Sequence, residues 1–499
     1  MRKKIIYIYA IIIASLNLTS CDDYLDLNPE DGTTREEFWQ TKEDVRAAVF
    51  GVYTAMLNAP KNSGTIAEQM FVHGEIRGGM VDLAFTTRDQ IDMLTTNILP
   101  TNSLSRWDMF YEIINYCNEV LAFGPGVLEK DPTFTQEQLD NYTSEVLAIR
   151  SYMYFSLSRI FRDVPLVLTA TLSDGDNFQI PVTKQEDIFN QVVADLVKAE
   201  SLAVEDYGDN ASNKGRITKN TINTMLTDVY LWQEKYDEAL IAADKVINSS
   251  EDYQLLDSRT LDWFNTVFAR GNSVESIFEL QYDTQILSPF YQMFSNNPNF
   301  IAEASVLEDV FGLDYNDANN VDVRGPRASL VPGTNEIYKF TGITSDNLQR
   351  KPSQSSDTHW FVYRYADLLL MKAEALNELD RGQEAIDIIE DIRFSRQAID
   401  LTEQVVSEND KIGIREYILA ERSRELAFEG KRWFDILRNA RKDNYAYKDI
   451  IIAIALKSAP ANQQQIITAK LQDVNSHYMP INENELFNNK ALVQNPFYK

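Results

Sequence analysis

The sequence contains little of the chemistry on which disulfides and metal sites depend. It has two cysteines and three histidines in 499 residues. Cys21 follows an apolar N-terminal leader, so Cys117 has no partner in the body of the chain, and a disulfide framework is excluded. The apolar surroundings of Cys117 predict an inert, buried thiol. His73, His359 and His477 lie far apart and form no HExxH motif, so no metal site is predicted.

Positive charge is also scarce. The chain has 47 lysines and arginines against 75 aspartates and glutamates, which gives a formal net charge of −28. We expect no binding to nucleic acid or other polyanions, because a surface that follows phosphates must be basic. A neutral ligand is favoured instead.

Common enzyme motifs and long apolar runs are missing as well. No GxSxG, P-loop or GxGxxG signature occurs. No apolar run after the leader reaches the length of a membrane-spanning helix, which is about 20 residues. The longest of these runs, residues 450–456, predicts a buried helix or strand.

The chain opens with a short secretory leader. Residues 2–4 are basic and residues 5–15 are almost wholly apolar, which is typical of a signal peptide. The Leu-Thr-Ser-Cys junction at 18–21 resembles a bacterial lipobox, and this resemblance implies cleavage before Cys21 and acylation of its thiol. A plain signal peptide followed by an incidental cysteine is the alternative. The aspartates at 22–23 resemble the acidic tag that sends some Gram-negative lipoproteins to the cell surface.

Behind the leader we predict one large domain. Residues 1–20 form the signal peptide, and residues 21–40 form an acylated tether with an N-terminal segment. Residues 41–499 form the domain, with loop-rich insertions at about 60–106 and 251–360. The second insertion is rich in Asn, Asp, Ser, Gly and aromatic residues and contains short strand-like runs. Long structured loops on a rigid frame often carry binding function.

Most of the remaining sequence is helical in pattern. Thr41, followed by two acids, predicts the start of a helix. Residues 141–161 carry apolar side chains at helical spacing and aromatic residues on the other faces, so we expect a helix that is buried nearly all round. Segments 229–247 and 373–393 each show a helix, a short polar turn and a second helix that begins with Glu-Ala-Leu or Glu-Ala-Ile. This pattern predicts tetratricopeptide-type helix pairs.

Several segments, in order along the chain, carry motifs of one known family. They are CDDYLDLNPED (21–31), RWDMFYEIINYCNEV (106–120), EVLAIRSYMYFSLSRIFRDVPLV (145–167), RYADLLLMKAEALNEL (364–379), ERSRELAFEGKRWFDILR (421–438) and HYMPINENELFNNKALVQNPFYK (477–499). Together they resemble the RagB/SusD family of outer-membrane nutrient-uptake, glycan-binding lipoproteins. The last segment departs from the family pattern at Asn482 and Phe497, where the family has proline and glycine.

This resemblance implies a fold and a function. The fold would be mainly α, with tetratricopeptide-type helix pairs packed against an irregular, loop-rich ligand-binding part with a few short strands. The protein would be lipid-anchored in the outer membrane and exposed at the cell surface, and it would not be an enzyme. It would bind an oligosaccharide, without a cofactor, and deliver it to a SusC-like TonB-dependent transporter. A peptide-binding or adaptor lipoprotein of tetratricopeptide type, serving peptide uptake, is the alternative.

Candidate ligand-binding residues follow from the chemistry of sugars. Glycan binding needs flat aromatic faces and a few planar polar side chains, and such sites usually lie on partly exposed loops. A buried ion pair is the alternative role for Arg77, and Trp107 is expected in the core because it lies in a helical motif. The candidates in the two loop regions are Arg77, Phe85, Arg88, Asp89, Tyr282, Tyr291, Phe294 and Trp360.

Two acidic patterns could suggest other chemistry. Glu421, Glu425 and Glu429 recur at helical spacing, but three arginines interleave with them at 422–432, so we predict a structural ion network rather than a hydrolytic pair. Residues 313–324 faintly resemble a calcium loop, but they lack the glycine and the final glutamate of an EF-hand. Asx-type turns are the stronger prediction there.

Overall fold

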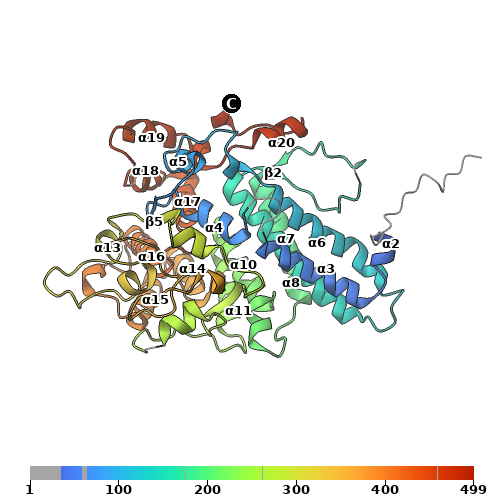
Figure 1. Ribbon diagram of the computed structural model, residues 1–499, viewed down its shortest axis with the longest axis horizontal. Coiled ribbons are helices and arrows are strands. Elements are labelled where there is room, and N and C mark those ends of the chain that lie inside the picture. The colour runs from blue at the N-terminus through green and yellow to red at the C-terminus, as the bar shows by residue number, and fades with distance from the viewer. Residues whose placement is uncertain (1–34, 59–63, 174, 261, 458) are drawn as a thin grey trace, which may run out of the picture.

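The computed structural model describes residues 35–58, 64–173, 175–260, 262–457 and 459–499, and its fold is mainly α as predicted (Figure 1). Cys21 and the leader lie outside the described residues. Within those residues, no helix is long and apolar enough to cross a lipid bilayer. The helices are α2 (Arg35–Phe38), α3 (Lys42–Leu57), α4 (Ile66–Glu75), α5 (Arg88–Leu94), α6 (Asp108–Val127), α7 (Gln136–Phe161), α8 (Gln185–Leu202), α9 (Asn210–Gly215), α10 (Lys219–Trp232), α11 (Tyr236–Ile247), α12 (Phe290–Phe294), α13 (Val306–Asp309), α14 (Tyr365–Glu378), α15 (Gly382–Ser395), α16 (Lys411–Glu425), α17 (Arg432–Tyr445), α18 (Asp449–Ala455), α19 (Gln464–Leu471) and α20 (Glu483–Asn488).

The strands are short and form antiparallel pairs. β1 (Val81–Leu83) pairs with β5 (Phe300–Ala302), β2 (Val164–Pro165) with β3 (Val182–Thr183), and β4 (Ser276–Leu280) with β6 (Trp360–Arg364). The second insertion therefore contains short strands as predicted, among them β4. The apolar run at 450–456 falls in α18 and is a helix.

The helix starts follow from capping side chains. Thr41 caps α3, and its hydroxyl accepts a hydrogen bond from the Asp44 amide, as the sequence predicts. α7 begins earlier than its apolar pattern suggests because Thr135 and Gln138 form a second capping box. Its C-terminal two-thirds is buried on every side, and it ends at Arg162, whose φ is 71°.

Both predicted helix pairs are present. α10 with α11, and α14 with α15, are joined by three-residue turns and pack against each other. The middle residue of each turn, Glu234 or Asp380, has a positive φ of 57° or 60°. The two turns therefore have the same backbone conformation. The similarity predicted between segments 229–247 and 373–393 is confirmed at the level of structure. α6, α7 and α8 pack in the same sequential manner (Figure 1).

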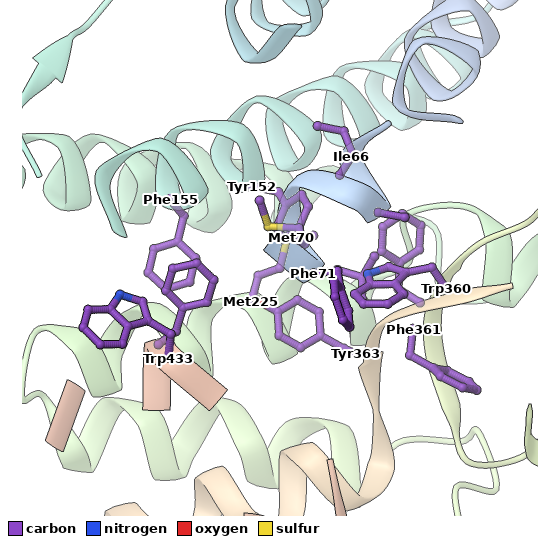
Figure 2. Packing of buried hydrophobic residues seen from close by; sticks show 14 of the residues in the cluster. Ile66, Met70, Phe71, Tyr152, Phe155, Met225, Trp360, Phe361, Tyr363 and Trp433 are labelled. Carbon is purple, nitrogen blue, oxygen red and sulfur yellow. The ribbon is translucent and has the colours of Figure 1, made fainter. Parts of the chain in front are cut away.

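The first insertion contains a buried helix that the sequence patterns missed. In α4, Thr65 and Glu68 form a capping box, and the helix places Met70 and Phe71 in the central core. Figure 2 shows these two side chains among Tyr152 of α7 and Trp360 of β6. The helix thereby fixes the start of the loop region to the centre of the molecule.

The acids at 421–429 form a buried ion network, as predicted, but most of their partners differ from those predicted. Glu425 accepts hydrogen bonds from Arg364 at 2.7 Å and from Arg396 at 3.0 and 3.1 Å. Arg324 contacts both Glu421 and Glu425, at 2.6 and 3.1 Å. These arginines come from segments far away in the sequence.

The interleaved arginines mostly serve other groups. Arg424 does pair with Glu421, at 2.9 Å, but Arg422 binds Asp367 and Asp435, each at 2.8 Å. Because α16 ends at Glu425, Glu429 and Arg432 lie beyond it and do not continue the helix face of Glu421 and Glu425. Hence spacing along an assumed helix gave the wrong partners.

Two smaller predictions are also confirmed. Asp314 accepts hydrogen bonds from the amides of Asn316 and Asp317, at 2.8 and 3.1 Å, so residues 313–324 do contain Asx turns. Cys117 is fully buried, and burial raises the pKa of its thiol to about 12, as expected for an inert group.

In the described parts of the chain, no group of three His, Cys, Asp or Glu side chains is placed to hold a metal ion.

Candidate functional site

The two predicted loop regions meet at the β1–β5 pair. Beyond this pair the contact continues, because the amides of Ala84 and Phe85 donate to the carbonyls of Asn299 and Pro298, at 3.0 and 3.1 Å. Phe85 stands at this junction with 62 % of its surface exposed. An apolar ring this exposed, on a backbone held by hydrogen bonds, is suited to contact with a ligand.

α5 follows Phe85 and orders the next loop. Thr87 and Gln90 form its capping box, and the exposed Arg88 pairs with Asp92 at 2.9 Å. Asp89 accepts hydrogen bonds from the Ser103 amide at 3.0 Å and from its hydroxyl at 2.5 Å. Asp89 therefore joins α5 to the turn at 102–105. Its Oδ2 atom accepts both hydrogen bonds, so this oxygen has little capacity left for a ligand.

A cavity of about 260 Å³ lies between these segments, and we call it the loop cavity. Its apolar lining includes buried side chains of α4, α6 and β5, namely Val72, Phe110 and Phe300. Its polar lining consists of planar or hydroxyl side chains from both loop regions and from the first residue of α6. These are Glu68, Gln69, Gln90, Ser103, Arg106, Asp108 and Asn299.

Arg106 and Asp108 hold each other in place at the rim of the loop cavity. Their side chains form a two-point contact, with Nε–Oδ1 at 3.2 Å and Nη2–Oδ2 at 2.8 Å. Both remain partly exposed, at 44 % and 38 % of the side-chain surface. A fork of this kind presents fixed donors and acceptors, which suits a ligand with several hydroxyl groups.

Residues 84–90, 103–108 and 296–299, together with the loop cavity, are referred to below as the loop face. It offers an exposed ring, amides, a hydroxyl and a pre-paired charge. The buried acids at 421–429 lie in the core and bind arginines, so they cannot serve as a hydrolytic pair on this surface. The chemistry of the loop face is that of recognition by hydrogen bonding and stacking.

Three of the predicted aromatic candidates are core residues. Trp360 is 1 % exposed and stacks on Phe290, with the ring centroids 5.5 Å apart. Phe294 is fully buried and packs edge-on against Phe71 at 4.8 Å, and Tyr282 is 2 % exposed. These three side chains are not available to a ligand in this structure. The turn-rich segments around them fold so that their aromatic rings pack against one another and against α4. Tyr291 is half-buried and remains a candidate.

Arg77 is also a core residue, with 5 % of its surface exposed. Its guanidinium lies over the ring of Trp433, 4.1 Å from the centroid, and donates to the carbonyl of His477 at 3.0 Å. Within the described residues Arg77 forms no ion pair with an acid, and its burial leaves little of its surface for a ligand.

Sequence reasoning missed all seven polar residues of the loop cavity, because none of the predicted candidates lines it. Two of them flank Trp107, and a charged pair on either side of a buried tryptophan is a signal that the sequence does contain. Gln69 and Asn299 carry no such signal. They meet only because the β1–β5 pairing joins segments more than 200 residues apart.

Comparison with known proteins gives consistent results over nearly the whole chain. Residues 308–498 match a family model described as "SusD family", and residues 23–249 match one described as "Starch-binding associating with outer membrane". SusD-like protein P38 of Formosa agariphila is 27 % identical over 485 residues, covering 87 % of this chain and 91 % of that protein. SusD-like protein P2 of the same organism is 23 % identical over 478 residues, covering 87 % and 90 %.

Solved structures show the same fold. A SusD superfamily protein from Bacteroides vulgatus has a TM-score of 0.74 at 21 % identity, covering 92 % of this chain and all of that one. A structure titled as a laminarin-binding SusD-like protein has a TM-score of 0.68 at 20 % identity, covering 92 % and 99 %.

Proposed function

Because the chain belongs to the SusD family, we propose that it binds an oligosaccharide at the outer membrane and passes it to a SusC-like TonB-dependent transporter for import. The exposed Phe85 beside the loop cavity carries this proposal, since it combines a free aromatic face with fixed planar polar groups. A lipid on Cys21 would hold the protein at the outer surface of the membrane.

A neutral glucan is the ligand class that fits best. The formal charge of −28 disfavours anionic polymers, and the rim of the loop cavity offers paired rather than unpaired charge. One matching family model is described as starch-binding, and one similar structure is titled as laminarin-binding. Both of these polymers are neutral glucans. Binding without catalysis is the role we assign to the protein.

Replacing Phe85 by alanine should weaken glucan binding about tenfold, or ~1.4 kcal/mol, because the stacking surface is lost. Calorimetric titration with maltooligosaccharides, laminarioligosaccharides and short peptides measures the change. Phe394→Ala is the matched control, because Phe394 is 70 % exposed but lies on α15, away from the loop face. Binding of peptides alone would instead support the peptide-uptake alternative.

Replacing Cys21 by alanine should release the protein from the membrane, because the acylated thiol is the proposed anchor. After a carbonate wash, the variant is expected in the soluble fraction and the wild-type protein in the membrane fraction. Cys117→Ala, which removes the buried thiol, should leave the protein in the membrane fraction, as in wild type. Retention of Cys21→Ala in the washed membrane would contradict the anchor.

The transporter partnership has its own test. Affinity-tagged protein, extracted from the native membrane in mild detergent, should co-purify with a TonB-dependent transporter. Purification without such a partner, while glucan binding is intact, would limit the proposal to capture alone.

A further inference from the structure

A second cavity lies on the other side of the segment that bounds the loop cavity. It has a volume of about 360 Å³, and we call it the C-terminal cavity. Arg106 and Asp108 line the loop cavity, whereas Trp107 between them lines the C-terminal cavity. The two cavities are therefore separated by one short ridge, residues 106–108.

The wall of the C-terminal cavity joins segments from three parts of the chain. α6 supplies one side, and the loop residues 165–173 and 175–180 and the C-terminal segment supply the others. Gln179 donates to the Asn488 carbonyl at 2.9 Å and accepts from the Lys490 amide at 2.7 Å. Asn489 donates to the Ile180 carbonyl, also at 2.7 Å. These contacts hold the loop against the C-terminal segment, and Figure 1 shows α20 beside this loop.

The cavity combines aromatic rings with hydrogen-bonding groups. Trp107, Tyr111 and Phe178 contribute the rings, and Phe178 keeps 51 % of its surface exposed. Its volume falls within the range of small-molecule sites, about 300–1,000 Å³. An exposed phenyl ring at the mouth of such a cavity can stack on the apolar face of a sugar.

Several polar groups at this cavity retain hydrogen-bonding capacity. Within the described residues, the side-chain amide of Asn488, the hydroxyl of Thr171 and the Nδ2 of Asn177 form no hydrogen bond. Glu485 adds a carboxylate: burial raises its pKa, and a hydrogen bond from Trp107 opposes that rise. No lysine or arginine is among the lining residues described, which disfavours an anionic ligand.

We propose that the C-terminal cavity is a second subsite, which holds a sugar residue of the same neutral oligosaccharide that binds the loop face. This inference rests on the proposed function. The ligand would cross the ridge at 106–108, with one part on the loop face and another part in the C-terminal cavity. Two linked contacts on one chain raise affinity for long ligands far more than for short ones.

The test compares glucan length in the full-length protein. Kd is measured by calorimetry for a disaccharide and for long chains of the maltose and laminaribiose series. In wild-type protein, affinity should rise with length. Phe178→Ala should weaken long-chain binding about tenfold and leave disaccharide binding unchanged, whereas Phe85→Ala should weaken both. Asn488→Ala, which removes a free amide, should reproduce the effect of Phe178→Ala in smaller degree.

Phe487→Ala is the matched control, because Phe487 is 75 % exposed on the same short helix as Asn488 but does not line the cavity. An unchanged long-chain Kd in Phe178→Ala would overturn the subsite and leave the loop face intact. Equal losses for disaccharide and long chain would also overturn it, since the cavity would then belong to the primary site. Absence of any glucan binding in wild-type protein would overturn the proposed function together with the subsite.

Discussion

Replacing Glu425 by glutamine is expected to lower the free energy of unfolding by about 3–5 kcal/mol, since removing one partner of a buried ion pair leaves uncompensated charge in the core. Glu425 is 3 % exposed and bonds to three guanidinium groups, those of Arg324, Arg364 and Arg396. Glutamine preserves the shape of the side chain but removes the negative charge. Chemical denaturation followed by circular dichroism measures the change.

The same network predicts how stability depends on pH. Burial opposes the ionisation of Glu425, but Arg396, Arg364 and Arg324 outweigh it and hold its pKa well below the usual value of 4.5. A depressed carboxylate pKa stabilises the folded state above that usual value, and the stabilisation is lost as the pH falls towards the folded-state pKa. Wild-type protein should therefore lose stability below about pH 4.5, and Glu425→Gln should lose less of it over the same range.

Glu384→Gln is the control for charge removal at the surface. Glu384 pairs with Arg381 three residues away, and both side chains are about half exposed. Its loss should cost at most about 0.5 kcal/mol. Equal stability of the Glu425→Gln and Glu384→Gln variants would show that the buried cluster is not a stabilising element.

Replacing Gly74 by alanine is expected to destabilise the protein by about 3 kcal/mol or more, because the added methyl group has no space. A Cβ at this position would lie 1.9 Å from the carbonyl oxygen of Gly430. Backbone on both sides prevents an easy adjustment, and the Gly430 amide also donates to Glu75 at 2.8 Å. Either α4 or the turn at 426–431 has to move, and displacement of α4 would carry Glu68 and Gln69 with it. Glucan affinity should therefore fall together with stability.

Replacing Gly51 by alanine should instead increase the stability of the protein. Gly51 lies in α3, and no atom would lie within 4 Å of a Cβ added there, so alanine should stabilise the helix by up to about 1 kcal/mol. Thermal unfolding of the two variants side by side separates the clash from the general effect of replacing glycine. A Gly74→Ala variant as stable as wild type would contradict the close backbone contact.

Local patterns in the sequence were sufficient for most of the helical scaffold. The capping threonine at 41, the apolar spacing of α7 and the repeated turn at 234 and 380 are all decided within a few residues. α4 was missed even though its capping box is visible in the sequence. α4 is short and its flanking residues favour turns. The whole segment was therefore interpreted as a loop, although residues 65–68 carry the capping signal.

The candidate site was predictable as a region but not as a set of residues. Phe85 and Trp360 look equivalent in sequence, because each is an aromatic residue beside a polar loop. Strand pairing separates them: β6 pairs with β4 inside the core, whereas Phe85 follows an edge that ends at the surface. Since such pairings join residues far apart in the chain, no local pattern reveals which ring stays exposed.

Residues 477–483 form hydrogen bonds with three segments from the first third of the sequence. Arg77 donates to His477, the Glu483 amide donates to the carbonyl of Pro100, and the Met479 amide donates to that of Ile160. Each of these contacts joins residues more than 300 positions apart, so its formation closes a long loop and costs conformational entropy. Pairs this far apart in sequence also raise the contact order, which slows folding. Arg77 and Pro100 therefore cannot complete these contacts until residues 477–483 have been synthesised, whereas β1 can pair with β5 as soon as residue 302 is present.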